Sequence, residues 1–219
     1  MRYCSPLTGD DRTPSLSIPG KTVIGMTGGV GAGKSFVLTI LRERYGAFIL
    51  EADRVSKSLI EKNGSAYDAV IGLLGSGILD PSGEIDKGKM ASLIFQDPGL
   101  LSAVNRILHP ATFEAVVRQI RQAEETLIVY ESALPHEARF PELCRHVLYV
   151  YTPKFQRIER LQASRGYSRE KCESIMRNQL TEAAYRSCSD AVLYNNGTPE
   201  ETAKRLERIM KKWGLAERS

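Results

Sequence analysis

One stretch of the sequence decides the fold: Val23-Ile24-Gly25-Met26-Thr27-Gly28-Gly29-Val30-Gly31-Ala32-Gly33-Lys34-Ser35. It opens as a short apolar run with β-branched residues, which indicates a buried strand. The pattern Gly28-x-x-x-x-Gly33-Lys34-Ser35 follows at once, and residues 36–44 are expected to form a helix. A strand, a glycine loop and a helix in this order are the context in which the pattern forms a phosphate-binding loop.

Each part of this loop can help to hold a polyphosphate. The glycines let successive backbone N–H groups surround the phosphates, and the positive end of the following helix points at the same charge. Lys34 can reach the outer phosphates, and the Ser35 hydroxyl is placed to take a magnesium ion. The alternative, a glycine-rich turn without a ligand, is disfavoured by the flanking strand and helix. The predicted contacts of a nucleoside triphosphate are Gly28, Gly29, Val30, Gly31, Ala32, Gly33, Lys34, Ser35 and Phe36.

The composition fits one globular α/β protein. A chain of 219 residues is long enough for one core with an insertion, but short for two independent domains. Hydrophobic residues at 42% predict a packed core, and a net charge of +4 says little about nucleic acid. The longest apolar runs have the length of strands, so no transmembrane helix is expected. Residues 1–20 lack the apolar core of a signal peptide and are predicted to be a flexible tail.

The cysteines and histidines show no spacing typical of a metal site. They are Cys4, Cys144, Cys172, Cys188, His109, His136 and His146. Because no two cysteines are close in the sequence, we expect free thiols in a reducing cytosol, and therefore a cytoplasmic protein.

Four more short apolar runs indicate strands. They lie near residues 47–50, 127–131, 147–151 and 191–194. Near-continuous apolar runs suit the buried strands of a parallel sheet that helices cover on both faces. The predicted fold class is therefore α/β: a P-loop NTPase-type, three-layer α/β/α arrangement with a parallel sheet, a helical substrate-binding insertion and a helical lid.

The rest of a single domain, residues 21–213, is predicted to be mainly helical. An insertion at about 54–122 combines helical apolar spacing with turn signals, and is expected to build a substrate site. A lid at about 154–186 contains two helices, with Ser168 as the N-cap of the second. Thr198 is expected to cap a terminal helix that runs to Trp213.

Two acidic residues that follow strands are candidates for chemistry. A carboxylate at the tip of a strand in a βαβ unit faces the ligand crevice, and Glu51-Ala52-Asp53 ends the second strand. Asp53 is the candidate to orient or deprotonate an attacking hydroxyl; the alternative is an aspartate that starts a loop or caps the helix that follows. Glu131 either holds magnesium through water or is an exposed acid at a strand end.

Three features favour a small-molecule kinase among the P-loop proteins: the strand-tip acid, the separate insertion and an arginine-rich lid. The lid arginines match phosphate oxygens and the charge of a metaphosphate-like transition state, although a solvated helix face would look similar. A GTPase would need an Asn-Lys-x-Asp guanine site, which the sequence lacks. Motor ATPases usually need a longer chain and a strongly acidic Walker B strand.

From Thr22 to about Ile209 the chain resembles the dephospho-CoA kinase family. The phosphate loop is common to many families, whereas its combination with the Asp53, His-Pro and Asn-Gly landmarks is specific. The matching stretches are residues 25–35, Glu51-Ala52-Asp53, Ile94-Phe95, Leu108-His109-Pro110, residues 131–137, residues 156–166 with Gln179, and residues 190–197.

The resemblance implies transfer of the γ-phosphate of ATP to the ribose 3′-hydroxyl of dephospho-CoA, the last step of coenzyme A biosynthesis. ATP and Mg²⁺ are the implied cofactors, with Ser35 as the magnesium ligand. The implied catalytic residues are Asp53, Lys34 and Arg160.

The resemblance also implies the remaining contacts of the site. The acceptor is expected near Thr27, Asp53, His109 and Glu137. ATP is expected to meet Arg165 in the lid and, at its adenine edge, Asn195-Asn196-Gly197.

Three departures from the family pattern lie outside the phosphate loop: Glu51 replaces an aspartate, Pro135-His136 stands in a usually apolar loop, and Tyr185-Arg186 falls where lysine is common. Two alternatives stay open, namely a P-loop kinase of another small hydroxyl acceptor, such as a nucleoside or nucleotide, and a nucleotide-binding module without catalysis. We expect no nucleic-acid or membrane partner, and a monomer or weak homo-oligomer.

Overall fold

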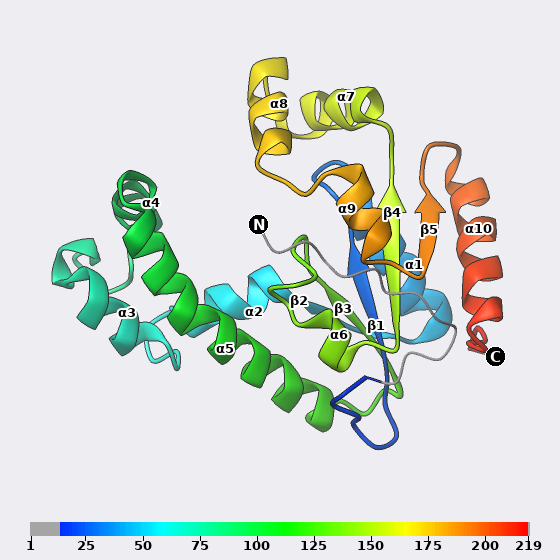
Figure 1. Ribbon diagram of the computed structural model, residues 1–219, viewed down its shortest axis with the longest axis horizontal. Coiled ribbons are helices and arrows are strands. Elements are labelled where there is room, and N and C mark those ends of the chain that lie inside the picture. The colour runs from blue at the N-terminus through cyan, green and yellow to red at the C-terminus, as the bar shows by residue number, and fades with distance from the viewer. Residues whose placement is uncertain (1–13, 219) are drawn as a thin grey trace. The chain divides into compact units, whose positions relative to one another are not determined.

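The computed structural model describes residues 14–218, and the chain divides into two compact units. The first unit contains the chain up to Ile49 together with the chain from Ala123 onward, and the second unit is Leu50–Gln122. In Figure 1 the second unit is drawn in cyan and green. The insertion predicted from the sequence at about 54–122 falls within this second unit.

A five-stranded sheet has the order β2-β3-β1-β4-β5 (Figure 1). Its strands are β1 (Thr22–Thr27), β2 (Phe48–Glu51), β3 (Leu127–Glu131), β4 (His146–Tyr151) and β5 (Ala191–Tyr194). β1 pairs in parallel with both β3 and β4, and β4 pairs in parallel with β5. The register places Met26 beside Glu131. The α/β fold class with a parallel sheet is confirmed.

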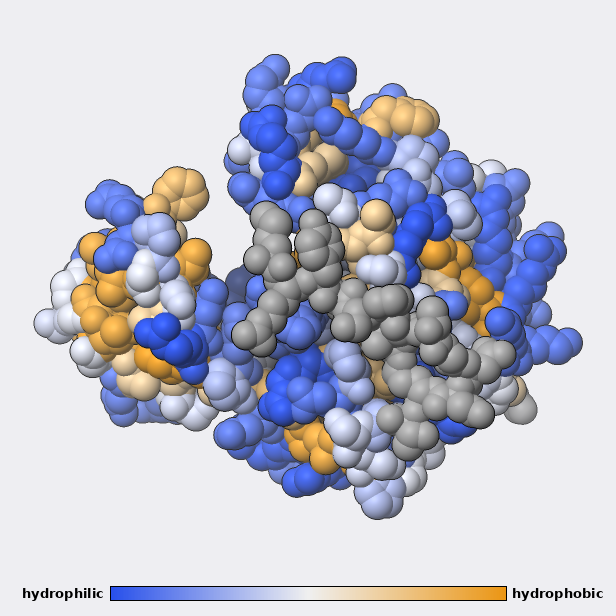
Figure 2. Space-filling view, in the orientation of Figure 1, coloured by the Kyte–Doolittle hydropathy of each residue, from blue (hydrophilic) through white to orange (hydrophobic). Residues whose placement is uncertain are grey.

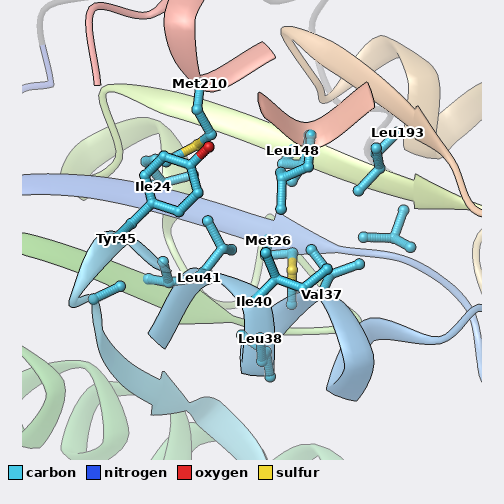
Figure 3. Packing of buried hydrophobic residues seen from close by; sticks show 14 of the residues in the cluster. Ile24, Met26, Val37, Leu38, Ile40, Leu41, Tyr45, Leu148, Leu193 and Met210 are labelled. Carbon is cyan, nitrogen blue, oxygen red and sulfur yellow. The ribbon is translucent and has the colours of Figure 1, made fainter. Parts of the chain in front are cut away.

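One face of β1 packs against two helices, α1 (Lys34–Tyr45) and α10 (Pro199–Lys212), as Figure 3 shows. Alternate strand residues point to the same face, so Ile24 and Met26 both enter this core. The cluster also includes Val37, Leu41, Leu148, Leu193 and Met210. Each such side chain contributes about 1.5–3 kcal/mol when it is fully buried. This core therefore fixes the strand and the helix on either side of the glycine loop.

Both of these helices have clear capping signals. α1 ends at Tyr45, and its C-cap is Gly46, whose φ of 60° is left-handed and is favourable for glycine. Before α10, the Thr198 hydroxyl accepts from the Glu201 N–H, and the Glu201 carboxylate accepts from the Thr198 N–H. This reciprocal pair is a capping box, and it confirms the N-cap that the sequence predicted at Thr198.

On the other face of β1, Gly25 leaves room for an aromatic ring. The short helix α6 (Phe140–Leu143) places the Phe140 ring there, 5.3 Å from the centroid of Tyr130. A Cβ atom at Gly25 would lie 2.6 Å from Phe140 Cδ2. The glycine at this position is therefore a packing requirement of the sheet.

The lid segment, predicted at about 154–186, contains three helices where the sequence predicted two. They are α7 (Lys154–Arg165), α8 (Arg169–Arg177) and α9 (Glu182–Ser187). Ser168 caps α8 as predicted, because its hydroxyl accepts from the Lys171 N–H. Thr181 caps the additional short helix in the same way, by accepting from the Ala184 N–H.

The second unit is helical. Its elements are α2 (Ala52–Leu59), α3 (Tyr67–Leu74), the 3₁₀ turn η1 (Ser76–Ile78), α4 (Lys87–Gln96) and α5 (Pro98–Gln122). They enclose a small core of Val70, Ile78, Ile85, Met90 and Val104. Figure 2 shows that hydrophobic residues also reach the surface of this unit, and the large exposed ones are Leu73, Leu93, Phe95 and Leu101.

The His109-Pro110 pair lies inside a helix. α5 continues for 25 residues and includes Pro110. A proline inside a helix removes one backbone hydrogen bond and costs about 3 kcal/mol. Phe113, Val116 and Ile120 beyond it are buried, and their burial offsets that cost.

The N-terminal and cysteine predictions have mixed outcomes. Residues 1–13 of the predicted tail lie outside the described part, but Ile18 is buried and the Leu16 N–H donates to Glu142 O. Cys144 and Cys172 are buried and form no disulfide, as predicted. The prediction is wrong for Cys188, which forms a disulfide, and Cys4 lies outside the described residues. Among the helices of residues 14–218, none is long and apolar enough to cross a membrane.

Candidate active site

The phosphate loop connects the end of β1 at Thr27 to the start of α1 at Lys34. Gly28, Gly31 and Gly33 have φ values of 150°, 76° and 85°, a region that residues with a Cβ atom rarely adopt. A Cβ atom at Gly28 would lie 2.6 Å from the backbone oxygen of Val150 in the neighbouring strand β4. Backbone conformation and space both require glycine at the first position of the pattern.

Three backbone donors of this loop remain available for a ligand. Among residues 14–218, no hydrogen bond uses the N–H of Gly31, Gly33 or Lys34. The last two open α1, where N–H groups have no partner within the helix and carry its partial positive charge. The loop therefore has the donors that an oxyanion ligand needs.

Lys34 is held over the loop by two oxygen atoms. Its Nζ donates to Gly28 O at 2.8 Å and lies 3.4 Å from Glu131 Oε1. Glu131 ends β3 and is buried, so the interpretation as a simple exposed acid is wrong. Ser35 and Phe36 follow on the exposed side of α1. The ammonium group is thus anchored beside unpaired N–H groups.

Asn195, directly after β5, is tied to the phosphate loop. Its side-chain Nδ2 donates to Ala32 O at 2.8 Å, and its Oδ1 accepts from Thr202 Oγ1 at 3.0 Å. Because the protein uses both ends of this buried amide, the Asn195 side chain serves to position the loop. Asn196 and Gly197 beyond it are exposed.

Arg160 of α7 is hydrogen-bonded to the backbone of Asn195. Its Nη2 donates to Asn195 O at 2.9 Å, and its Nη1 donates to Thr152 Oγ1 at 3.2 Å. The Thr152 hydroxyl is in turn within hydrogen-bonding distance of Ala32 O and Asn195 O, at 3.0 and 2.8 Å. Arg165, at the end of the same helix, is exposed, with its guanidinium 5.9 Å from the ring centroid of Tyr167.

A different lid arginine contacts the phosphate loop directly. Arg157 Nε donates to Val30 O at 2.7 Å, and its Nη2 donates to Gln179 Oε1 at 2.8 Å. Burial lowers the pKa of the Arg157 guanidinium. The sequence indicated arginines in this segment, but the spacing alone did not show which of them would face the loop.

Thr27 provides a polar atom at the base of the loop. Its side chain is fully buried, and its Oγ1 has no hydrogen-bond partner among residues 14–218. A buried hydroxyl without a partner costs about 1–3 kcal/mol. A bound ligand that hydrogen-bonds to the Thr27 hydroxyl would remove this cost.

Comparison with known proteins identifies the family. A family model described as dephospho-CoA kinase matches residues 22–201. The dephospho-CoA kinase of Geobacter sulfurreducens is 34% identical over 193 residues, which is 87% of this chain and 98% of that protein. The one from Carboxydothermus hydrogenoformans is 31% identical over 194 residues, 87% of this chain and 94% of that protein.

The chain belongs to the dephospho-CoA kinase family. Among solved structures, TT1252 from Thermus thermophilus is similar, with a TM-score of 0.76 and 26% sequence identity. The likeness covers 88% of this chain and 97% of that one. The resemblance deduced from the sequence is therefore confirmed over residues 22–201.

Two residues that the family resemblance singled out belong to the second unit. β2 ends at Glu51, one residue beyond the predicted strand at 47–50, and Asp53 is an exposed residue in the first turn of α2. The N-cap of α2 is Glu51, so Asp53 is not the capping residue that the alternative required. His109 is half-buried within α5.

Other residues of the dephospho-CoA kinase pattern lie in the first unit. Glu137 is exposed between β3 and α6, and Pro135 nearby is buried although it departs from the family pattern. Tyr185 is buried and stacks on Tyr149 with 5.1 Å between ring centroids. Arg186 forms an ion pair with Glu182 at 2.8 Å. The positive charge of Arg186 is therefore partly neutralised within α9.

The described residues contain few candidate ligands for a metal ion. No group of three or more His, Cys, Asp or Glu side chains between residues 14 and 218 could hold one. The Ser35 hydroxyl is exposed at the start of α1, and the Glu131 carboxylate lies beside Lys34. Such a sparse donor set suits Mg²⁺, which usually keeps several waters and binds substrate phosphates.

Proposed function

We propose that this protein transfers the γ-phosphate of ATP to the ribose 3′-hydroxyl of dephospho-CoA, and so forms coenzyme A and ADP. The observation that carries the proposal is family membership over residues 22–201, together with the anchored Lys34 in the phosphate loop. The phosphate loop supports the binding of ATP, and membership of the family indicates that dephospho-CoA is the acceptor.

The phosphate loop positions the triphosphate. The unpaired N–H groups at the start of α1 donate to phosphate oxygens, and Lys34 exchanges its bond to Gly28 O for the outer phosphates. In phosphoryl transfer the protein contributes mainly positioning and charge stabilisation. Thr27 offers its unpartnered hydroxyl to the transferred group.

Asp53 is the proposed partner of the acceptor. The 3′-oxygen attacks the γ-phosphorus, the bond from that phosphorus to the bridging oxygen of ADP breaks, and the hydroxyl proton passes to the Asp53 carboxylate. A positioned base of this kind contributes about 10²–10⁴-fold to a rate. His109 and Glu137 are proposed acceptor contacts on the strength of the family landmarks.

Mg²⁺ would be held by Ser35, with Glu131 acting through water. When bound, the ion would neutralise charge on the β- and γ-phosphates. The exposed Ser35 hydroxyl and the Glu131 carboxylate at the phosphate loop are oxygen donors, the type of ligand that Mg²⁺ prefers.

The lid segment is proposed to close over ATP and exclude water, which would otherwise accept the phosphoryl group. Arg160 and Arg165 are its proposed ATP contacts, and Asn195-Asn196-Gly197 is proposed to border the adenine. A cytoplasmic location, a monomeric or weakly oligomeric state and the absence of a nucleic-acid partner stay predictions.

An acceptor panel tests this proposal. The purified protein is incubated with Mg–ATP and, in turn, dephospho-CoA, adenosine, a nucleoside monophosphate or no acceptor, and ADP release is followed. We expect release with dephospho-CoA to exceed that with any other acceptor by at least about a hundredfold. Preference for a nucleoside or nucleotide would favour the rival kinase, and no release with any acceptor would favour a binding module.

A further inference from the structure

Val30 of the phosphate loop is held by two side chains from the lid segment. Gln179 Oε1 accepts from the Val30 N–H at 3.1 Å, and Arg157 Nε donates to Val30 O at 2.7 Å. Arg157 Nη2 also donates to the same Gln179 oxygen, at 2.8 Å. These three residues, here named the Val30 clamp, form a closed set of hydrogen bonds.

The loop glycines admit the clamp at close range. A Cβ atom at Gly29 would lie 2.6 Å from Arg157 Cζ, and one at Gly31 would lie 2.9 Å from Arg157 O. The guanidinium and the backbone of α7 therefore pack directly on the loop. A larger residue at Gly29 would displace the Arg157 guanidinium, and one at Gly31 would press on the backbone of α7.

Arg157 has no charged partner to account for its place in the protein. Among residues 14–218 it forms no ion pair, and its Nη1 donates to no protein group. It is half-buried, and a partly desolvated cation without a counter-charge is costly. Its bonds go instead to one backbone oxygen and one neutral amide, which fix geometry.

We propose that Arg157 and Gln179 are positioning residues that fix Val30, so that the N–H groups of Gly31, Gly33 and Lys34 are preset for the triphosphate. ATP affinity thereby depends on the helices of the lid segment. The proposal rests on the proposed function only in requiring that the loop binds ATP, and it does not depend on the acceptor.

Two conservative variants distinguish an effect of hydrogen-bond geometry at Val30 from an effect of the positive charge of Arg157. Gln179→Met keeps the size of the side chain but removes the acceptor oxygen. Arg157→Lys keeps the charge but cannot donate to Val30 O and Gln179 with the planar spacing of a guanidinium. The matched controls are Gln162→Met and Glu159→Gln, which change exposed residues of α7.

The Kd of ATP, measured by calorimetry without acceptor, is expected to rise about tenfold in Gln179→Met and in Arg157→Lys. The KM of the acceptor is expected to stay at the parental value, and both controls to bind ATP as the parent does. Amide exchange of the Val30 N–H, followed by NMR without nucleotide, is expected to be slow in the parent and fast in Gln179→Met.

The proposal is overturned if both variants bind ATP within about twofold of the parent, or if Val30 exchange does not change. The proposal would also be overturned if Arg157→Lys bound ATP as tightly as the parent. A positive charge at this position would then be enough for ATP binding, without the planar geometry of the guanidinium. Should one variant fail to fold, as judged by thermal unfolding, the other decides the outcome. A parent that binds ATP but makes no coenzyme A would refute the proposed function and leave this test intact.

Discussion

At the scale of single residues, the site depends on charges that the protein anchors before a ligand arrives. Lys34 has Gly28 O and Glu131 Oε1 as neighbours, so its ammonium is fixed beside the N–H groups at the start of α1. Exchange of these partners for phosphate oxygens requires little rearrangement. Because the long Lys34 side chain is already ordered, its ordering costs little free energy when ATP binds.

Replacement of Lys34 tests this arrangement. Lys34→Ala is expected to weaken ATP binding about a hundredfold, since charge-assisted hydrogen bonds are each worth about 1.5–3 kcal/mol, and also to lower kcat. Calorimetry and steady-state kinetics measure the two effects. Lys21→Ala, which changes a lysine bound to Ala123 O and Glu125 O, is the control for nonspecific loss of charge. Parental ATP affinity in Lys34→Ala would contradict the assignment of the phosphate loop.

Asp53 gives a prediction with the opposite kinetic pattern. Asp53→Asn is expected to lower kcat by about a hundredfold or more and to leave the Kd of ATP unchanged, because the carboxylate acts on the acceptor. Asp68→Asn is the matched control, since Asp68 is also exposed in the first turn of a helix of the second unit. An unchanged kcat would remove Asp53 from the chemistry.

At the scale of elements, the strands and capped helices could be predicted because their signals are local. The apolar run before Gly28 and the Thr198 capping box are complete within a few residues of sequence. The passage of α5 through Pro110 could not be predicted, because the burial of Phe113 and Val116 that supports it is a tertiary effect. The contact between Arg157 and the phosphate loop could not be predicted either. It depends on how α7 packs on the loop, and the spacing of arginines in the sequence does not determine that packing.

The glycine loop gives a prediction at this scale. Gly28→Ala is expected to abolish ATP binding and to lower stability, because its Cβ atom would meet Val150 O, a backbone atom that cannot rotate away. The control is Gly72→Ala inside α3, where a Cβ atom meets nothing within 4 Å. That change is expected to stabilise the protein by about 0.5–1 kcal/mol. Denaturant unfolding and calorimetry compare the two, and tolerance of Gly28→Ala would contradict the close approach of loop and β4.

At the scale of the whole molecule, buried phenols are expected to make stability depend on pH in the alkaline range. Burial raises the pKa of Tyr45, Tyr149 and Tyr185 to about 12. In the unfolded chain these groups ionise near pH 10. Between about pH 10 and pH 12 the unfolded state loses protons that the folded state keeps, so stability falls as the pH rises; below this window their contribution is complete.

Unfolding free energies across this window test the effect. We expect the parent to lose stability more steeply than Tyr45→Phe between about pH 9 and pH 11, because the variant lacks one of the three phenols. Equal slopes in the two proteins would contradict a raised pKa at Tyr45.

Formation of coenzyme A tests the proposed activity of the whole molecule most directly. The purified protein is incubated with Mg–ATP and dephospho-CoA, with Lys34→Ala as the inactive control, and the products are identified by mass spectrometry and phosphorus NMR. We predict one new phosphoryl group, on the ribose 3′-oxygen, with the parent only. Unchanged dephospho-CoA, or a phosphoryl group on another atom, would contradict the assigned reaction.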